Sequence, residues 1–154
     1  ASDLIIDTTR TNVQQLREMV RARVDRRTEQ RLSLTFSSFA YKHGVPLDAD
    51  YVFDLRVLPN PHYIRALRAL TGRDAPVAAY LDAQPEAVEM IERIESFLDR
   101  WLDAFAIDQR AYLTVALGCT GGQHRSVYAA ERLAARFAAR APTLVRHREQ
   151  DSDS

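Results

Sequence analysis

The sequence is poor in cysteine, and Cys119 is the only one among 154 residues. A single cysteine can form no disulfide within its own chain and cannot build a zinc cluster by itself. This composition favours the reducing cytoplasm. No apolar run approaches the roughly 20 residues of a membrane-spanning helix, and the N-terminal residues lack the basic start and long apolar run of a secretory signal. From these absences we expect a cytoplasmic protein with no membrane partner.

The sequence also lacks a net charge, because 21 Lys and Arg residues balance 21 Asp and Glu residues. Total charge therefore gives no sign of a nucleic-acid-binding protein, although a local basic patch is compatible with it. Lysine is nearly absent: apart from Lys42, every basic residue other than histidine is an arginine, and the guanidinium group suits bidentate binding of carboxylates and phosphates. The 118–126 turn described below is not a Walker A loop, since it lacks the Gly-Lys-Ser/Thr ending.

What the sequence does contain is an alternation of strand-like and helix-like segments, with 46% hydrophobic residues to form a core. Strand signals fall at residues 4–6, 32–41, 51–58, 112–117 and 143–148, with a short extended run at 76–81. Helical periodicity falls at residues 11–24, 64–70, 85–105 and 126–140. The alternation predicts an α/β fold with an open, mostly parallel sheet flanked by helices.

Residues 118–126, Gly-Cys-Thr-Gly-Gly-Gln-His-Arg-Ser, form the turn between the most apolar predicted strand and the next helix. A helix N-terminus presents free N–H groups and the positive end of the helix dipole. Glycines let the backbone approach an anion closely. The contributing residues are Thr120, Gly121, Gly122, His124, Arg125 and Ser126. This combination predicts an anion-binding turn suited to phosphate, at the edge of the sheet where α/β proteins bind ligands.

Basic and imidazole side chains also follow two other predicted strands. Lys42 and His43 come directly after the strand at 32–41, while Arg56 and His62 lie at the end of the strand at 51–58. If these strands are parallel neighbours, their carboxyl ends meet at the same edge of the sheet. We therefore expect these four side chains to join the 118–126 turn around one pocket, and we predict no metal site there.

The spacing of Cys119 and Arg125, with five residues between them and Ser126 following, supports a second interpretation. It matches the phosphate loop of cysteine-dependent phosphatases, in which a thiolate at a helix N-terminus attacks phosphorus. Such an enzyme also needs an acid for the leaving group. The candidate acids are Asp48, Asp50 and Asp82. Against this interpretation, Gly118 stands where those phosphatases usually carry histidine, and a small buried residue is the simpler role for Cys119.

An ordered set of motifs resembles the C-terminal domain of the RapZ/YvcJ family of bacterial nucleotide-binding proteins. The motifs are Phe39-x-x-Lys42-His43-Gly44-x-Pro46, Asp48-Ala49-Asp50-Tyr51-Val52-Phe53-Asp54, Arg56-x-Leu58-Pro59-Asn60-Pro61-His62, Leu70-Thr71-Gly72 and Gly118-Cys119-Thr120-Gly121-Gly122-x-His124-Arg125-Ser126. The resemblance implies that residues 1–30 are the tail of a missing N-terminal P-loop domain with its connecting helix. Residues 31–148 would be the C-terminal ligand- and RNA-binding domain. The composition of residues 149–154 predicts a disordered acidic tail.

The resemblance also implies a function. The domain would be a metabolite-sensing regulatory domain that binds a phosphorylated amino sugar such as glucosamine-6-phosphate, and an RNA-binding module that presents small RNA to an endoribonuclease. It would be no enzyme and would need no cofactor of its own, whereas the missing domain would bind ATP or GTP. Family members self-associate, so a homo-oligomer is expected. The matching pocket positions are His62, Thr120, Gly121 and Arg125, with His43 and His124 nearby.

RNA binding has the weaker basis in the residues themselves. The RNA-binding adapter ends in a Lys/Arg-rich tail, whereas this chain ends in Glu-Gln-Asp-Ser-Asp-Ser, whose acidic groups repel phosphates. A basic strip is left for RNA, formed by Arg136, Arg140, Arg146 and Arg148. Two alternatives stay open: a cysteine-dependent phosphatase that uses Cys119 and Arg125, and an oligomerisation scaffold with a vestigial pocket.

Overall fold

The computed structural model describes residues 32–108 and 111–151, so the predicted strand at 4–6, the helix at 11–24 and the whole 1–30 segment lie outside the described residues. Four parallel strands form one sheet in the order β2-β3-β1-β4. The strands are β1 Ser33–Ala40, β2 Tyr51–Asp54, β3 Tyr112–Cys119 and β4 Thr143–His147. The helices are α2 Ala75–Asp82, α3 Pro85–Ile107, α4 Arg125–Phe137 and α5 Arg148–Asp151, and the 3-10 turns are η2 Tyr41–His43, η3 Pro61–Tyr63 and η4 Arg65–Leu67. The predicted α/β fold with an open parallel sheet is confirmed.

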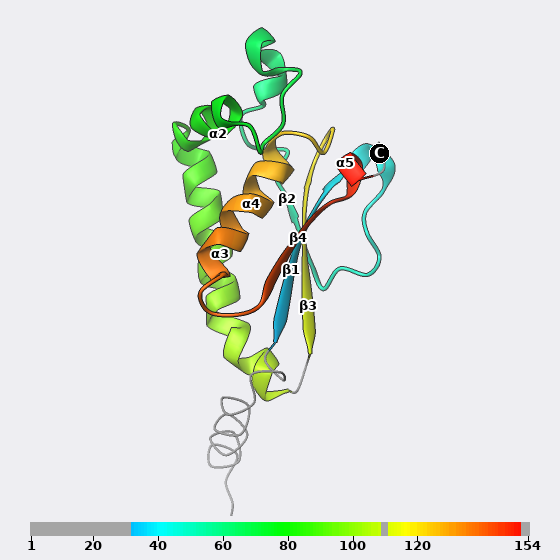
Figure 1. Cartoon of the computed structure of the whole chain (residues 1–154), viewed down its shortest axis with the longest axis vertical. Coiled ribbons are helices and arrows are strands. Elements are labelled where there is room, and N and C mark those ends of the chain that lie inside the picture. The colour runs from blue at the N-terminus through cyan, green and yellow to red at the C-terminus, as the bar shows by residue number, and fades with distance from the viewer. Residues whose placement is uncertain (1–31, 109–110, 152–154) are drawn as a thin grey trace, which may run out of the picture.

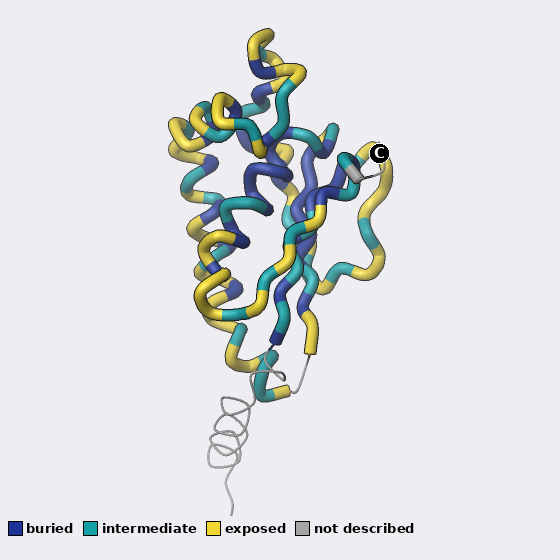
Figure 2. Tube along the Cα trace, viewed as in Figure 1, coloured by how far each residue is buried: buried dark blue, intermediate teal, exposed yellow. Residues whose placement is uncertain are grey.

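The two central strands, β1 and β3, are the most buried, because both of their edges are paired and one face is covered by helices. In β1, Phe36 lies opposite Val115 of β3 on one side and Val145 of β4 on the other. Helices α2, α3 and α4 cover one face of the sheet, and the connection from η2 to β2 crosses the other (Figure 1). The buried residues gather between the helices and the sheet (Figure 2). The short edge strand β2 alternates between half-buried and exposed residues, as an edge strand does.

Residues 76–81, which the sequence predicts as an extended run, form most of helix α2 instead. Pro76 lies in the first helical turn, where its missing N–H costs nothing because that turn has no carbonyl to bond. Val77 and Leu81 are four residues apart and both fully buried, which is the helical period. The prediction fails because proline suggests a break, whereas at this position it marks a helix start.

The segments around β2 are shorter than the sequence predicts. The strand predicted at 51–58 ends at Asp54, and the helix predicted at 64–70 is reduced to the single 3-10 turn η4, which η3 precedes. After β2 the Leu58 N–H donates to the Leu55 carbonyl at 3.1 Å, and both leucine side chains are buried. This turn redirects the chain over the end of the sheet, toward the turn at 118–126.

The disorder predicted for the acidic tail is wrong for residues 149–151, which belong to α5. The Glu149 side chain is only 6% exposed. Its carboxylate accepts a hydrogen bond from the Ala40 N–H at 2.9 Å and lies 2.6 Å from His43 Nδ1. These partners lie more than 100 residues away in sequence, and they offset the cost of burying a charge. Residues 152–154 lie outside the described part of the chain.

Candidate anion-binding site

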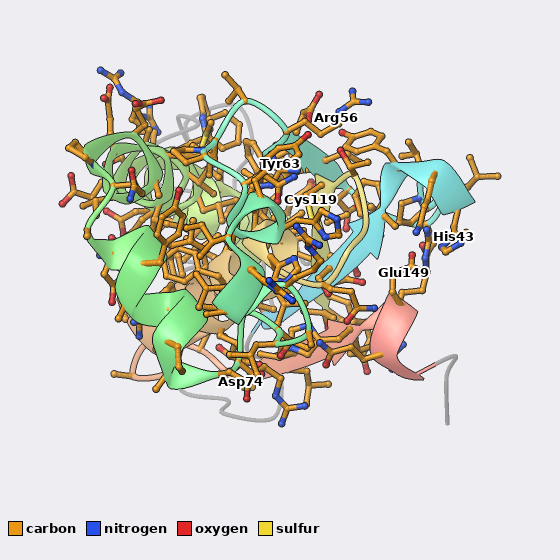
Figure 3. All side chains as sticks on the ribbon, turned by 90° about the horizontal axis from the view of Figure 1, so that it is seen from above. His43, Arg56, Tyr63, Asp74, Cys119 and Glu149 are labelled. Atoms are coloured by element: carbon orange, nitrogen blue, oxygen red, sulfur yellow. The ribbon has the colours of Figure 1, made fainter. Side chains whose placement is uncertain are left out.

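The turn at 118–126 connects the end of β3 to the start of α4, and close backbone packing fixes its shape. Gly122 adopts φ +73°, in the left-handed region that favours glycine. The Gly72 N–H donates to the Gln123 carbonyl at 2.8 Å, and a Cβ on Gly72 would lie 2.4 Å from the His124 carbonyl oxygen. The turn is therefore held from the side by the Leu70-Thr71-Gly72 segment. Figure 3 looks down on this end of the sheet and labels Cys119 at the end of β3.

A cavity of about 510 Å³ opens above this turn. Five of the side chains that line it are cations or imidazoles, and of the described residues that line it none is Asp or Glu. The lining residues are Lys42, Asn60, His62, Tyr63, Arg68, Ala69, Leu70, Thr71, Cys119, Thr120, Gly121, Gln123, His124 and Arg125. The volume suits a small metabolite and the lining suits an anion.

Arg125, the first residue of α4, is 4% exposed and has both a structural and a free side. Its Nη1 donates to the carbonyls of Arg56 at 2.9 Å and Leu58 at 3.0 Å, which ties the chain after β2 to the start of α4. Its Nε is buried without a hydrogen-bond partner in the described part of the chain. A buried guanidinium N–H without an acceptor is costly, and because Nε itself is covered, an oxygen can bind it only if the groups around Arg125 shift.

His124 and His62 form an imidazole pair on one wall of the cavity, with ring centroids 6.2 Å apart. The His124 Nε2 lies 3.1 Å from the Leu67 carbonyl, so this nitrogen carries the hydrogen and donates it. Burial lowers the pKa of His124 although carbonyl contacts act in the opposite direction, and the nearby His62 lowers it further. The neutral ring then has a lone pair on Nδ1, which can accept a hydrogen bond from a ligand hydroxyl or amine.

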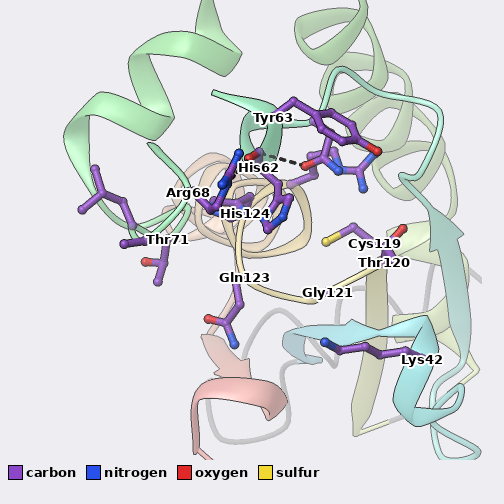
Figure 4. Close-up of a pocket in the computed structure, with 14 residues that line it drawn as sticks. Lys42, His62, Tyr63, Arg68, Thr71, Cys119, Thr120, Gly121, Gln123 and His124 are labelled. Carbon is purple, nitrogen blue, oxygen red and sulfur yellow. Dashed lines mark hydrogen bonds between the residues drawn. The ribbon is translucent and has the colours of Figure 1, made fainter. Parts of the chain in front are cut away.

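Figure 4 shows how the labelled side chains surround the cavity. The histidines lie together, the Cys119 thiol points toward them, and Lys42 extends from η2 on another side. Arg68 is fixed at the rim, since its Nε donates to the His62 carbonyl at 2.9 Å. The predicted meeting of strand-end residues thus brings Lys42, His62, His124 and Arg125 to one cavity, together with Thr120 and Gly121.

The remaining predicted pocket residues do not line the cavity. His43 turns away to Glu149, and Arg56 pairs with Asp54 through Nε at 2.9 Å and Nη2 at 2.7 Å. The hydrogen bonds from Arg56 lower the pKa of Asp54. Gly122 shapes the turn from behind, and Ser126 is fully buried beneath it. These residues support the site and do not face a ligand.

The structure contains the loop that a cysteine-dependent phosphatase needs, but none of the three candidate acids lies next to it. Cys119 is 2% exposed, and its thiol donates to Ser126 Oγ at 3.2 Å. The candidate acids lie elsewhere: Asp50 accepts from the Thr114 N–H, Asp82 accepts from Tyr128 and Arg132, and Asp48 lines a separate cavity. With no carboxylate among the described lining residues, the geometry supports binding of a phosphate better than its transfer.

The predicted basic strip is divided among several elements. Arg136 and Arg140 of α4 pair with Glu95 and Asp99 of α3. Arg148 donates to the Gly44 carbonyl at 2.7 Å and to Glu149. Arg146 is exposed on β4 and lines a second cavity of about 190 Å³. Three of the four guanidinium groups therefore already have acceptors within the domain.

The sequence reasoning missed several residues that line the cavity, among them Tyr63, Arg68 and Gln123. Asn60 and Thr71 lie in motifs shared with the family, and their positions next to proline and glycine were the available signal. Arg68 carried no such signal, because its place depends on how the chain folds after β2. Among residues 32–108 and 111–151, no three His, Cys, Asp or Glu side chains are placed to share a metal ion, and no helix has the length and apolarity to cross a membrane.

Comparison with known proteins assigns the chain to a protein family. A family model described as the RapZ C-terminal domain matches residues 32–151. The chain belongs to the RapZ C-terminal domain family. The matched range extends past the boundary predicted at residue 148 and includes α5, in agreement with the burial of Glu149.

Several relatives of this family are similar over nearly the whole chain. A nucleotide-binding protein of Leptothrix cholodnii is 65% identical over 145 residues, which are 94% of this chain and 45% of the relative. A nucleotide-binding protein of Methylibium petroleiphilum is 64% identical over 96% of this chain and 48% of its own length. One of Alkalilimnicola ehrlichii is 59% identical over 96% and 51%. The chain thus spans about half the length of these relatives.

Proposed function

We propose that the cavity binds a phosphorylated amino sugar of the glucosamine-6-phosphate type, and that the domain acts as a metabolite sensor. The observation that carries the proposal is Arg125, a buried cation on the cavity wall whose Nε has no hydrogen-bond partner in the described part of the chain. It lies at the start of α4, where the free N–H groups of the first helical turn also favour an anion. We expect a bound phosphate to accept hydrogen bonds from both the Arg125 guanidinium and these N–H groups.

The lining offers separate groups for each part of such a ligand. Lys42, Arg125 and the Thr120 hydroxyl can hold the phosphate through charge-assisted hydrogen bonds. The sugar hydroxyls and amine need acceptors, and the amide oxygens of Asn60 and Gln123 each have a second lone pair beside the bond they accept from the His62 N–H or from Gln150. An ammonium group held by neutral oxygens gains less than one paired with a carboxylate, so we expect the phosphate to supply most of the affinity.

The wider role concerns a longer protein, because the relatives are about twice as long as this chain. We propose that this domain is the regulatory half of a cytoplasmic, homo-oligomeric RNase adapter. Its other half would bind ATP or GTP, consistent with the names of the relatives. In this proposal the sugar phosphate reports a metabolite level, and the adapter presents a small RNA to an endoribonuclease. The family membership supports the regulatory role.

The first test is unfolding of the chain with and without glucosamine-6-phosphate, glucose-6-phosphate, glucosamine and inorganic phosphate. A ligand at about 100 times its dissociation constant adds about 2.7 kcal/mol to the unfolding free energy, which raises the melting temperature by about 5–10 °C in a domain of this size. Lys42→Met should weaken the shift, and Arg65→Met, at an exposed position outside the cavity, should not. No shift with any of the phosphates would refute the proposal and favour the scaffold alternative.

RNA binding has its own test, which uses Arg146 because it is exposed on β4. If Arg146 contacts RNA phosphate, Arg146→Ala should weaken binding and reduce the slope of log affinity against log salt by about 0.7–0.9. Arg93→Ala, on the exposed side of α3, is the matched control. An unchanged salt slope in Arg146→Ala would exclude this residue from the RNA surface.

A further inference from the structure

The Glu149 side chain lies where three parts of the chain meet next to the cavity. Its Oε2 accepts hydrogen bonds from the Ala40 N–H at 2.9 Å and from Arg148 Nη2 at 3.0 Å, and its Oε1 lies 2.6 Å from His43 Nδ1. Figure 3 shows the His43 and Glu149 side chains side by side, and neither of them lines the cavity. The residue is a buried carboxylate that does not face the proposed ligand.

These contacts hold the turn that carries Lys42. The turn η2 lies between Ala40 and Gly44, and Arg148 Nη2 donates to both of their carbonyls, at 3.3 Å and 2.7 Å. Glu149 binds the same turn through the Ala40 N–H and His43. Helix α5 therefore fixes both ends of the segment from which Lys42 extends into the cavity.

The same helix also contacts the anion-binding turn from behind. A Cβ on Gly122 would lie 2.4 Å from Glu149 Cγ, so the Gly122 backbone packs directly on this side chain. Gln150 Nε2 lies 3.4 Å from Gln123 Oε1, and Gln123 lines the cavity. Two walls of the cavity, Lys42 on one side and Gln123 on the other, are thus joined through α5.

The ionised Glu149 carboxylate is suited to hold α5 against the segments that form the cavity walls. Burial alone raises the pKa of Glu149, but the hydrogen bonds from Ala40, His43 and Arg148 outweigh it and leave the pKa below its ordinary value. The side chain is therefore ionised at neutral pH, and a buried carboxylate that loses its partners is costly. Movement of α5 away from the sheet is opposed by these interactions, and movement of either cavity wall must disturb them.

We propose that Glu149 is a positioning residue for the anion site, and that it couples the segment 148–151 to occupancy of the cavity. The inference rests on the proposed function for its ligand, while the positioning of Lys42 can be tested without one. Because such coupling is reciprocal, ligand binding would hold α5 in place. A partner that displaces α5 would likewise weaken ligand binding.

The test uses the fact that Lys42 is the only lysine in the sequence. Reductive methylation with labelled formaldehyde gives one lysine signal in NMR spectra, which reports the surroundings of the Lys42 amine. Glu149→Gln keeps the size of the side chain and removes its charge. Glu95→Gln, in the ion pair with Arg136 between α3 and α4, is the matched control.

We expect Glu149→Gln to shift the Lys42 signal in the ligand-free protein and to weaken the binding of glucosamine-6-phosphate and inorganic phosphate by about fivefold or more. Glu95→Gln should leave both unchanged. In the wild-type chain, glucosamine-6-phosphate should slow amide hydrogen exchange in residues 148–151 and at Ala40, a measurement that needs no variant to fold.

Each outcome separates the two proposals. An unchanged Lys42 signal in Glu149→Gln overturns the positioning role. A shifted signal with unchanged affinity, or amide exchange in 148–151 that ignores a bound ligand, overturns the coupling. If the wild-type chain binds neither glucosamine-6-phosphate nor phosphate, the proposed function and the coupling both fail, and the ligand-free Lys42 signal still decides the positioning role.

Discussion

Removing the Arg125 side chain should destabilise the domain even without a ligand. Its Nη1 donates to the carbonyls of Arg56 and Leu58, and Arg125→Ala leaves both acceptors without that donor. Hydrogen bonds to a charged group are worth about 1.5–3 kcal/mol each, but water from the open cavity can replace part of this. Loss of the buried aliphatic portion adds to the cost, so we expect a decrease of about 3 kcal/mol in the unfolding free energy.

Urea denaturation monitored by circular dichroism can measure this change, and the melting temperature should fall by about 6–12 °C. Arg68→Ala is the control, because Arg68 lines the same cavity but is exposed, and its side chain donates to the His62 carbonyl on the surface. Arg125→Lys keeps the charge without the planar fork and should fall between wild type and Arg125→Ala. If Arg125→Ala loses no more stability than Arg68→Ala, the structural role assigned to Arg125 is wrong.

Three further predictions follow from single groups near the site. Gly122→Ala should cost about 2 kcal/mol or more, because φ +73° strains any other residue and the new Cβ meets Glu149; Gly121→Ala, with nothing within 4 Å of its Cβ, should cost far less in the same urea titration. Burial and the hydrogen bond to Asp82 raise the pKa of Tyr128 to about 12. The contribution of neutral Tyr128 to stability is therefore complete below pH 10 and is lost as pH rises toward 12. An absorbance titration of tyrosinate should show this late ionisation, and Tyr128→Phe should remove it. Burial lowers the pKa of His124 below its ordinary 6.5, so the unfolded chain binds more protons at this residue than the folded chain does. The unfolding free energy should therefore fall as pH drops below 6.5. If the melting temperature of His124→Gln depends on pH in the same way as that of the wild-type chain, this prediction is wrong.

The meeting of strand-end residues at one cavity could be predicted because strand ends in a parallel sheet share an edge. That rule brings Lys42, His62 and the 118–126 turn together from segments far apart in sequence. The rule does not say which way a side chain points. Arg56 and Asp54 are two residues apart at the end of β2, and the Arg56 N–H donates to Asp54 Oδ1, so a local pair forms that the sequence spacing could have indicated.

Other parts of the site depend on contacts that have no local signal. Glu149 meets Ala40 and His43 across more than 100 residues, and an acidic end of a sequence predicts solvent exposure on composition alone. Arg68 reaches the cavity rim only because the chain after β2 folds into two 3-10 turns instead of a helix. Tertiary packing decides both cases, and neither propensity nor periodicity contains that information.

The Cys119-x5-Arg125-Ser126 spacing serves a different purpose here from the one it suggests. In a thiol phosphatase the arginine must turn both prongs toward the transferred phosphate, whereas Arg125 uses Nη1 to hold the backbone after β2. Cys119 is buried, and its thiol hydrogen-bonds to Ser126. Nη1 is thus committed to the fold and the thiol donates within the turn, and among the described residues that line the cavity no carboxylate is placed to protonate a leaving group. This arrangement favours the reversible binding that the proposed sensor requires.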